Sequence, residues 1–247
     1  RMTRVSGLWL GVVYIAALSG CKSKPVEPPD ESKTPYTMPG LEHGLLQSPV
    51  NILSNEIEGG QHQISVNYHD AEPRHLENKG TTIELDFPEG SSITFDGQEY
   101  QLKQLHFHTP SEHQIDGITY PMEMHIVNVM NTKEEGEPPH YLVISYLFRM
   151  GEEEPFIASF LDEVPTQEGG KDLAPGTVII EPKGRESTPE FYHYRGSLTT
   201  PPNTETVEWL IVKEIQQASP AQIRRINLLE GDNARHVQAL YGRKVED

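Results

Sequence analysis

The sequence predicts a mainly β protein of the α+β class that folds as a single domain, and three observations lead to this prediction. Between about residues 45 and 213 the chain consists of short alternating or apolar runs, which is the pattern of strands. Turn-forming pairs such as Asp96-Gly97 separate them, so neighbouring strands should be antiparallel. Two other stretches have the spacing and end residues of helices. The expected strands are 62–68, 81–87, 91–95, 100–108, 120–130, 141–149, 177–181, 191–194 and 206–213.

The first twenty residues have the features of an export signal. An apolar run over residues 8–18 follows two arginines and is too short to span a bilayer, which is typical of a signal-peptide core. The next residues, Ser-Gly-Cys, resemble the bacterial lipoprotein processing box. We expect residues 1–20 to be a lipoprotein signal peptide and Cys21 to be lipidated. The protein would then be exported and anchored in the cell envelope, on its periplasmic or extracellular face. A buried free thiol is the alternative for Cys21.

Residues 21–40 are rich in proline and charge and contain few apolar side chains. The few apolar contacts of such a segment cannot offset the conformational entropy lost on ordering. We therefore expect a flexible tether after the lipidated cysteine. The predicted folded domain therefore covers residues 41–247.

The two predicted helices are 154–162 and 219–229. The first places its apolar residues on one side. The second begins with Ser219 as its cap and Pro220 in its first turn, and Gly231 ends it.

Composition limits the classes of function. The 37 acidic and 20 basic side chains give a net charge of −17, which repels phosphate backbones and argues against nucleic-acid binding. A single cysteine excludes an internal disulfide and any cysteine-based zinc site. Other residue types must therefore bind any metal.

Three histidines are the candidate metal ligands. Side chains at positions i and i+2 of a strand point the same way, about 6.6 Å apart along its axis, so His106 and His108 can reach one ion. On an antiparallel neighbour, His125 could lie opposite them. Three histidines with an open fourth position are typical of catalytic zinc. Two half-exposed histidines without a metal are the alternative, because the chain holds eleven histidines.

Two polar neighbours favour the metal site. Gln104 and Glu123 each precede a candidate ligand by two residues and so share its face. Each can therefore hydrogen-bond the free ring nitrogen of a histidine and fix its tautomer. A carboxylate at position 123, between two methionines, would be costly to bury without such a partner.

The loop over residues 196–202, Gly-Ser-Leu-Thr-Thr-Pro-Pro, is the second candidate segment. An ordinary Thr/Pro loop is the alternative. A hydroxyl beside a zinc-bound hydroxide can donate only where its proton finds an acceptor, which a buried carboxylate such as Glu112 would supply.

Together these motifs resemble those of the α-class carbonic anhydrases, in a bacterial lipoprotein form. The resemblance covers about residues 45–243, which is nearly the whole predicted domain. The segments that carry it are Gln47 through Ile52, Gln104 through His108, Ser111-Glu112-His113, Asp116-Gly117, Tyr120 through His125, Gly196 through Pro202, Trp209, and Asn233-Ala234-Arg235.

The resemblance implies a central, mostly antiparallel twisted sheet with short peripheral helices. It implies Zn2+ on His106, His108 and His125, and Thr199 bonded to Glu112 to orient the nucleophile. It also implies supporting roles for Gln104, His113, Glu123, Tyr194 and Asn233, and cis peptide bonds at Ser48-Pro49 and Pro201-Pro202.

The implied reaction is the reversible hydration of carbon dioxide to bicarbonate and a proton, by attack of zinc-bound hydroxide. Carbon dioxide is apolar and needs an apolar wall beside the metal. The matching positions are Val127, Val143, Leu198 and Trp209, although ordinary core is the alternative for each. We expect Thr200 on the polar side, near the departing bicarbonate.

One departure from the family pattern concerns proton transfer. Thr81 stands where the family often carries a proton-shuttle histidine, and threonine cannot hold a proton near pH 7. We therefore expect proton release to limit turnover at low buffer concentration. Among the other histidines, His62, His69 and His75 are candidates to replace the missing group.

Two other functions fit part of the sequence. A carbonic-anhydrase-like surface binding module with weak catalysis is one alternative. A cupin-type metalloenzyme is the other, because His106-x-His108-x3-Glu112 resembles its first ligand cluster, but the second cluster is missing. The expected partners are the small-molecule substrate and, through the lipid anchor only, a membrane; a homodimer is left open.

Overall fold

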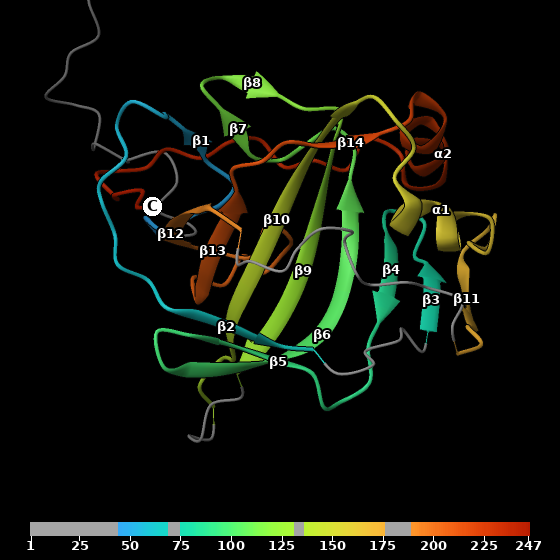
Figure 1. Cartoon of the computed structure of the whole chain (residues 1–247), viewed down its shortest axis with the longest axis horizontal. Helices are drawn as coiled ribbons and strands as arrows, with labels where there is room; N and C mark the ends of the chain where they lie inside the picture. The colour runs from blue at the N-terminus through green and yellow to red at the C-terminus, as the bar shows by residue number, and fades with distance from the viewer. Residues whose placement is uncertain (1–43, 69–74, 131–135, 176–188) are drawn as a thin grey trace, which may run out of the picture. The chain divides into compact units, whose positions relative to one another are not determined.

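The computed structural model describes residues 44–68, 75–130, 136–175 and 189–247. All of these residues belong to the second of two units into which the chain divides, Pro39–Asp247. This unit is mostly β with two short helices, as the sequence predicts (Figure 1). Within the described ranges, no helix is long and apolar enough to cross a membrane.

The elements follow one another along the chain with short strands around three long ones. They are β1 (Asn51–Ile52), β2 (Ile64–Asn67), β3 (His75–Asn78), β4 (Ile83–Asp86), β5 (Ser92–Phe95), β6 (Gln98–His108), β7 (Gln114–Ile115), β8 (Ile118–Thr119), β9 (Met122–Met130), β10 (His140–Met150), α1 (Pro155–Leu161), β11 (Gly169–Asp172), β12 (Phe191–Gly196), β13 (Val207–Val212), β14 (Gln216–Ala218) and α2 (Pro220–Glu230).

One large twisted sheet carries the fold, and its main path runs in the order β11-β3-β4-β6-β9-β10-β13-β12. The long strands β6, β9 and β10 lie side by side at its centre (Figure 1). Most neighbours are antiparallel, but β10 pairs in parallel with β13 and β14, so the sheet is mixed. The chain leaves β10, passes through α1, β11 and β12, and only then returns as β13, a path that allows parallel pairing. The short strands β1, β7 and β8 form a separate small sheet.

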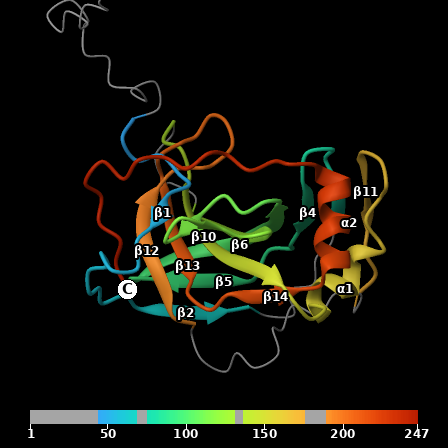
Figure 2. The ribbon, with the colours of Figure 1, turned by 90° about the horizontal axis from the view of Figure 1, so that it is seen from above.

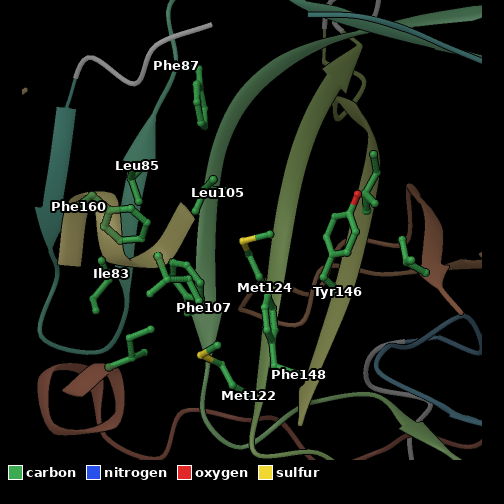
Figure 3. Close-up of a cluster of buried hydrophobic side chains, with 14 of the residues drawn as sticks. Ile83, Leu85, Phe87, Leu105, Phe107, Met122, Met124, Tyr146, Phe148 and Phe160 are labelled. Carbon is green, nitrogen blue, oxygen red and sulfur yellow. The ribbon is translucent and has the colours of Figure 1, made fainter. Parts of the chain in front are cut away.

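The two faces of this sheet have different contents because side chains alternate along each strand. On one face, Leu105 and Phe107 of β6 join a large apolar cluster with Met122 and Met124 of β9 (Figure 3). On the other face lie the histidines that alternate with them and a second apolar cluster that includes Trp209.

Both helices pack at the end of the sheet formed by β11, β3 and β4 (Figures 1 and 2). Phe160 of α1 packs on Phe107 with the ring centroids 6.0 Å apart. The N-terminus of α2 carries a capping box, in which Ser219 and Gln222 bond each other's backbone N–H. Gly231, with φ 72°, ends the helix. Both predicted helices are therefore confirmed to within one residue at each end.

Eight of the nine predicted strands correspond to β2, β4, β5, β6, β9, β10, β12 and β13. The ninth, 177–181, lies outside the described residues, as do the segments 1–20 and 21–40 and Cys21. The prediction misses β1, β3, β7, β8, β11 and β14, which have only two to four residues each. The sequence of β11, Gly-Gly-Lys-Asp, has no apolar side chain to signal a strand. The expected cis bonds at Ser48-Pro49 and Pro201-Pro202 are present, with a third at Thr109-Pro110.

Candidate metal centre

Strands β6 and β9 bring three histidines to one point. In their antiparallel register His106 lies opposite His125, and His108 lies opposite Glu123. Each of the three histidines offers one ring nitrogen, and these nitrogens all lie within 4.8 Å of one another. The predicted metal-ligand residues therefore meet on one face of the sheet.

Polar neighbours orient two of these rings. His106 Nδ1 lies 2.8 Å from Gln104 Oε1, and His125 Nε2 lies 2.6 Å from Glu123 Oε1. An amide or carboxylate oxygen accepts from an N–H, so these contacts assign the ring protons to His106 Nδ1 and His125 Nε2. The two remaining nitrogens are His106 Nε2 and His125 Nδ1. They carry lone pairs and lie 3.3 Å apart.

The third ring, that of His108, is buried beside Asn233, and neither of its nitrogens makes a hydrogen bond of good geometry within the part of the chain that the structure describes. An unpaired buried nitrogen is costly unless a ligand satisfies it. Burial lowers the pKa of all three histidines, and that of His108 falls to about 4. The rings are therefore neutral near pH 7, and neutral imidazole is the form that binds a metal.

These observations fit a zinc ion. Ligands of tetrahedral zinc, at about 2.0–2.1 Å from the metal, lie about 3.3 Å from one another. The separation of His106 Nε2 and His125 Nδ1 is 3.3 Å. A different group, His113, Glu123 and His125, is also close together, but its contacts of 2.6 and 2.7 Å are those of hydrogen bonds. Of these two groups, the three histidines are therefore the one with unfilled coordination.

Glu123 is the hub of the buried network behind the centre. Its Oε1 lies within hydrogen-bonding distance of His125 Nε2, His113 Nδ1 and the hydroxyl of Ser145, while Oε2 accepts from the backbone N–H groups of Glu112 and His113. These contacts hold the pKa of Glu123 well below its usual value even though burial acts to raise it. Glu123 thus stays ionised and fixes the ring of His125.

The network continues away from the centre through His113. Its Nε2 lies 2.6 Å from the Tyr194 hydroxyl, which in turn donates to Ser48 Oγ at 2.9 Å. Ser48 Oγ also accepts from the backbone N–H of Ser197, at the start of the loop 196–202. The loop is thereby tied to the carboxylate that orients His125.

Glu112 is buried directly beside the centre. Its Oε2 lies 3.5 Å from His108 Nε2, and its Oε1 accepts from the backbone N–H of Arg235 at 2.9 Å. Burial raises the pKa of Glu112, and the neighbouring Thr199 side chain and the Arg235 N–H act in the opposite direction. Thr199, which is half-buried, thus lies beside the Glu112 carboxylate.

The predicted apolar wall lies on the face of the sheet that carries the histidines. Val127, Val143 and Trp209 are opposite one another on β9, β10 and β13, and Leu198 packs against the same cluster. The indole ring of Trp209 lies 4.9 Å from the ring of His125, measured between centroids. Thr200 is exposed in the loop, where its carbonyl accepts from the N–H of Asn203.

Asn233 acts on the backbone at His108. Its Oδ1 accepts from the N–H of Thr109, and its Nδ2 donates to the carbonyls of Phe107 and Thr81. It thus fixes the strand end on both sides of the histidine and positions Thr81, whose side chain is exposed.

Two of the three proposed substitutes for the proton shuttle contact carboxylates. His62 Nδ1 lies 2.8 Å from Asp96, and His75 Nδ1 lies 2.8 Å from Asp172 on β11. His69 lies outside the described residues.

Sequence reasoning missed three contributors to the site, which are Ser48, Ser145 and the backbone of Arg235. The register of β10 on β9 places Ser145 opposite His125, so strand pairing is the signal that would have found it. Ser48 and Arg235 reach the site from loops, and a single sequence does not predict which elements a loop contacts.

The sequence and the fold of this chain are similar to those of known proteins. The sequence matches the eukaryotic-type carbonic anhydrase family over residues 34–247. It is 37% identical over 206 residues to a carbonic anhydrase of Neisseria gonorrhoeae, covering 82% of this chain and 77% of that protein. It is also 29% identical over 195 residues to dioscorin dioA3 of Dioscorea japonica, covering 77% and 69% of the two chains. The fold is similar to an α-carbonic anhydrase of Thermovibrio ammonificans solved with sulfanilamide, with a TM-score of 0.74, 31% identity, and coverage of 83% and 91%.

Proposed function

The chain belongs to the eukaryotic-type carbonic anhydrase family, and we propose that it hydrates carbon dioxide reversibly to bicarbonate and a proton with a zinc ion held by His106, His108 and His125. The observation that carries this proposal is the convergence of three neutral imidazoles, one of which has two buried and unpaired nitrogens. Three protein ligands leave a fourth position for water, which a catalytic site requires.

Zinc at this centre would supply Lewis acidity that lowers the pKa of a bound water to about 7, the established value for carbonic anhydrases. The protein supplies the orientation. Gln104 and Glu123 hold the rings of His106 and His125 in the tautomer whose lone pairs point to the centre. Asn233 holds the backbone on both sides of His108.

Thr199 and Glu112 orient the attacking oxygen. A threonine hydroxyl that donates its proton to the ionised Glu112 has only lone pairs left to offer. It then accepts a hydrogen bond from the solvent-derived nucleophile and directs a lone pair of that oxygen toward the substrate. The N–H of Arg235, which donates to Glu112 Oε1, helps to keep the carboxylate ionised despite its burial.

The apolar wall receives the substrate. Carbon dioxide has no charge and forms only weak hydrogen bonds, so Val127, Val143, Leu198 and Trp209 bind it by contact and exclude water from its carbon. Bicarbonate is charged and is destabilised beside the same wall, so it leaves toward the exposed Thr200.

Proton release follows from the residue at position 81. Thr81 cannot take up a proton near pH 7, so buffer molecules remove the product proton. Turnover is therefore limited by buffer at low buffer concentration, and imidazole buffers restore it.

The function is tested by replacing one ligand. His108→Ala loses the zinc ion of this centre and, with it, carbon dioxide hydration, because the remaining two histidines leave the metal with too few ligands. The control is His140→Ala, which removes a partly exposed histidine at the start of β10 that lies near Glu137. Zinc content by mass spectrometry and stopped-flow hydration are measured together. Full activity in His108→Ala would overturn the ligand assignment.

The cellular setting that we propose follows from the N-terminal segment. A lipid on Cys21 and a tether over residues 22–40 would hold the enzyme in the cell envelope. There it would interconvert carbon dioxide, which crosses membranes, and bicarbonate, which does not. Labelling with a radioactive fatty acid, lost in Cys21→Ser, tests the anchor. Sedimentation of the same preparation tests whether a homodimer forms.

A further inference from the structure

A second group of histidines and carboxylates lies apart from the centre described above. It consists of His62, just before β2, His193 on β12, and Glu246. His62 Nε2 and His193 Nδ1 each lie 3.3 Å from Glu246 Oε2, and the three ligand atoms are within 4.8 Å of one another. Three segments far apart in the sequence thus place two nitrogens and one oxygen around a single point.

This group is on the opposite face of the sheet from the three catalytic histidines. In β12, Tyr194 points to the cluster that contains Trp209, and its neighbour His193 points the other way because side chains alternate. The ring of His193 instead lies 5.2 Å from that of Phe95, whose side chain belongs to the other apolar cluster. The two groups cannot share one ion.

Carboxylates fix the outer nitrogen of each ring. His62 Nδ1 lies 2.8 Å from Asp96 Oδ2, and His193 Nε2 lies 2.7 Å from Glu208 Oε2. An N–H on these nitrogens donates to the carboxylates and leaves a lone pair on His62 Nε2 and on His193 Nδ1. A histidine whose outer N–H is held by a carboxylate is the usual form of a metal ligand.

Without a cation the inner atoms are only partly satisfied. Among the residues that the structure describes, the 3.3 Å contact of His193 Nδ1 with Glu246 Oε2 is the one hydrogen bond between them, and it needs a proton on that nitrogen. In these tautomers two ring lone pairs and a carboxylate oxygen point at one another. His62 Nε2 is buried and, within the described residues, makes no hydrogen bond of acceptable geometry. A shared cation satisfies all three atoms.

The distances between the two nitrogens and Glu246 Oε2 also fit a zinc ion. Each nitrogen lies 3.3 Å from Glu246 Oε2, which is longer than a charge-assisted hydrogen bond and equal to the separation of about 3.3 Å expected between tetrahedral zinc ligands. A cavity of about 560 Å³ is lined by all five of these histidine and carboxylate residues, so solvent can reach the group.

We propose that His62, His193 and Glu246 bind a second divalent metal ion of the zinc type, with its fourth position open to the cavity. Two histidines and a glutamate are a known ligand set for zinc. The backbone at Glu246 already pairs with His193, in N–H to carbonyl bonds of 2.8 and 2.9 Å. The ion would therefore clamp this segment to β12 and to the β2–β5 pair.

The test counts zinc bound to the full-length chain, produced without a histidine tag. The wild type binds two equivalents at equilibrium, and the double variant His62→Gln/His193→Gln binds one and keeps its hydration activity, which also shows that it folds. His108→Ala binds one equivalent, and this equivalent raises its thermal midpoint. Loss of that binding in His108→Ala combined with Glu246→Gln would assign it to the second group.

Two results would overturn the proposal. One is a wild type that binds a single equivalent. The other is a double variant that still binds two. If the double variant does not fold, Glu246→Gln alone removes the anionic ligand with little change of shape and is judged by the same count. Failure of the catalytic proposal would appear differently, as inactivity of a wild type that retains zinc.

Discussion

Glu230, the last residue of α2, offers a quantitative test of burial in this fold. Its side chain is only 4% exposed. Oε1 accepts from the Thr109 hydroxyl at 3.1 Å, and Oε2 has no partner among the residues that the structure describes. Burial raises the pKa of Glu230 from 4.5 to about 8, and hydrogen bonds from the Thr109 hydroxyl and the Ile83 backbone offset only part of this effect.

The direction of the effect on stability follows from proton binding. Between pH 4.5 and about 8 the folded state keeps a proton on Glu230 that the unfolded state has released. The free energy of unfolding therefore falls as the pH rises through this range. The shift from 4.5 to about 8 corresponds to about 5 kcal/mol at 1.36 kcal/mol per unit, an upper limit because water that enters around the ionised carboxylate reduces it.

Glu230→Gln removes the titration and keeps an acceptor for Thr109. We expect the variant to melt close to the wild type at pH 5 and several degrees higher at pH 8.5, because about 1 kcal/mol shifts the midpoint by about 2–4 °C in a domain of this size. Differential scanning calorimetry across this range measures the difference, in which effects common to both proteins cancel. Glu153→Gln, at an exposed glutamate, is the control. If the difference between the thermal midpoints of wild type and Glu230→Gln is the same at all pH values, the reasoning is refuted.

Three other outcomes are expected. Thr81→His increases stopped-flow turnover at low buffer by about 10-fold or more, because an imidazole can accept the product proton, and the difference disappears in concentrated imidazole buffer. Gln104→Ala weakens zinc binding by about 10- to 100-fold in a chelator competition, because His106 loses the acceptor that orients it; unchanged affinity would exclude that role. Phe160→Ala lowers the free energy of unfolding by about 3–5 kcal/mol in urea, since the ring is fully buried against Phe107. A loss below about 1 kcal/mol would mean that α1 contributes little to the core.

The convergence of the three candidate ligand histidines could be predicted from the sequence because their geometry is local. Alternation alone places His106 and His108 on one face, and one antiparallel pairing adds His125. The second group could not be predicted, since His62, His193 and Glu246 share no strand and only the fold joins them. For the same reason the parallel pairing of β10 with β13 could not be predicted, because it depends on the path of the chain between them.

The irregularity in β6 has a consequence for changes of chain length. The register of β6 on β9 shifts between Leu102 and Gln104, so Lys103 is an extra residue that reverses the alternation. Leu102 and Leu105 can therefore both face the apolar core. Deleting Lys103 would remove the bulge and join the two halves of β6 in one regular register, so His106 and His108 would keep their face of the sheet. Position 103 should therefore tolerate a change of chain length better than the positions from Gln104 to His108, where a deletion would reverse the histidines.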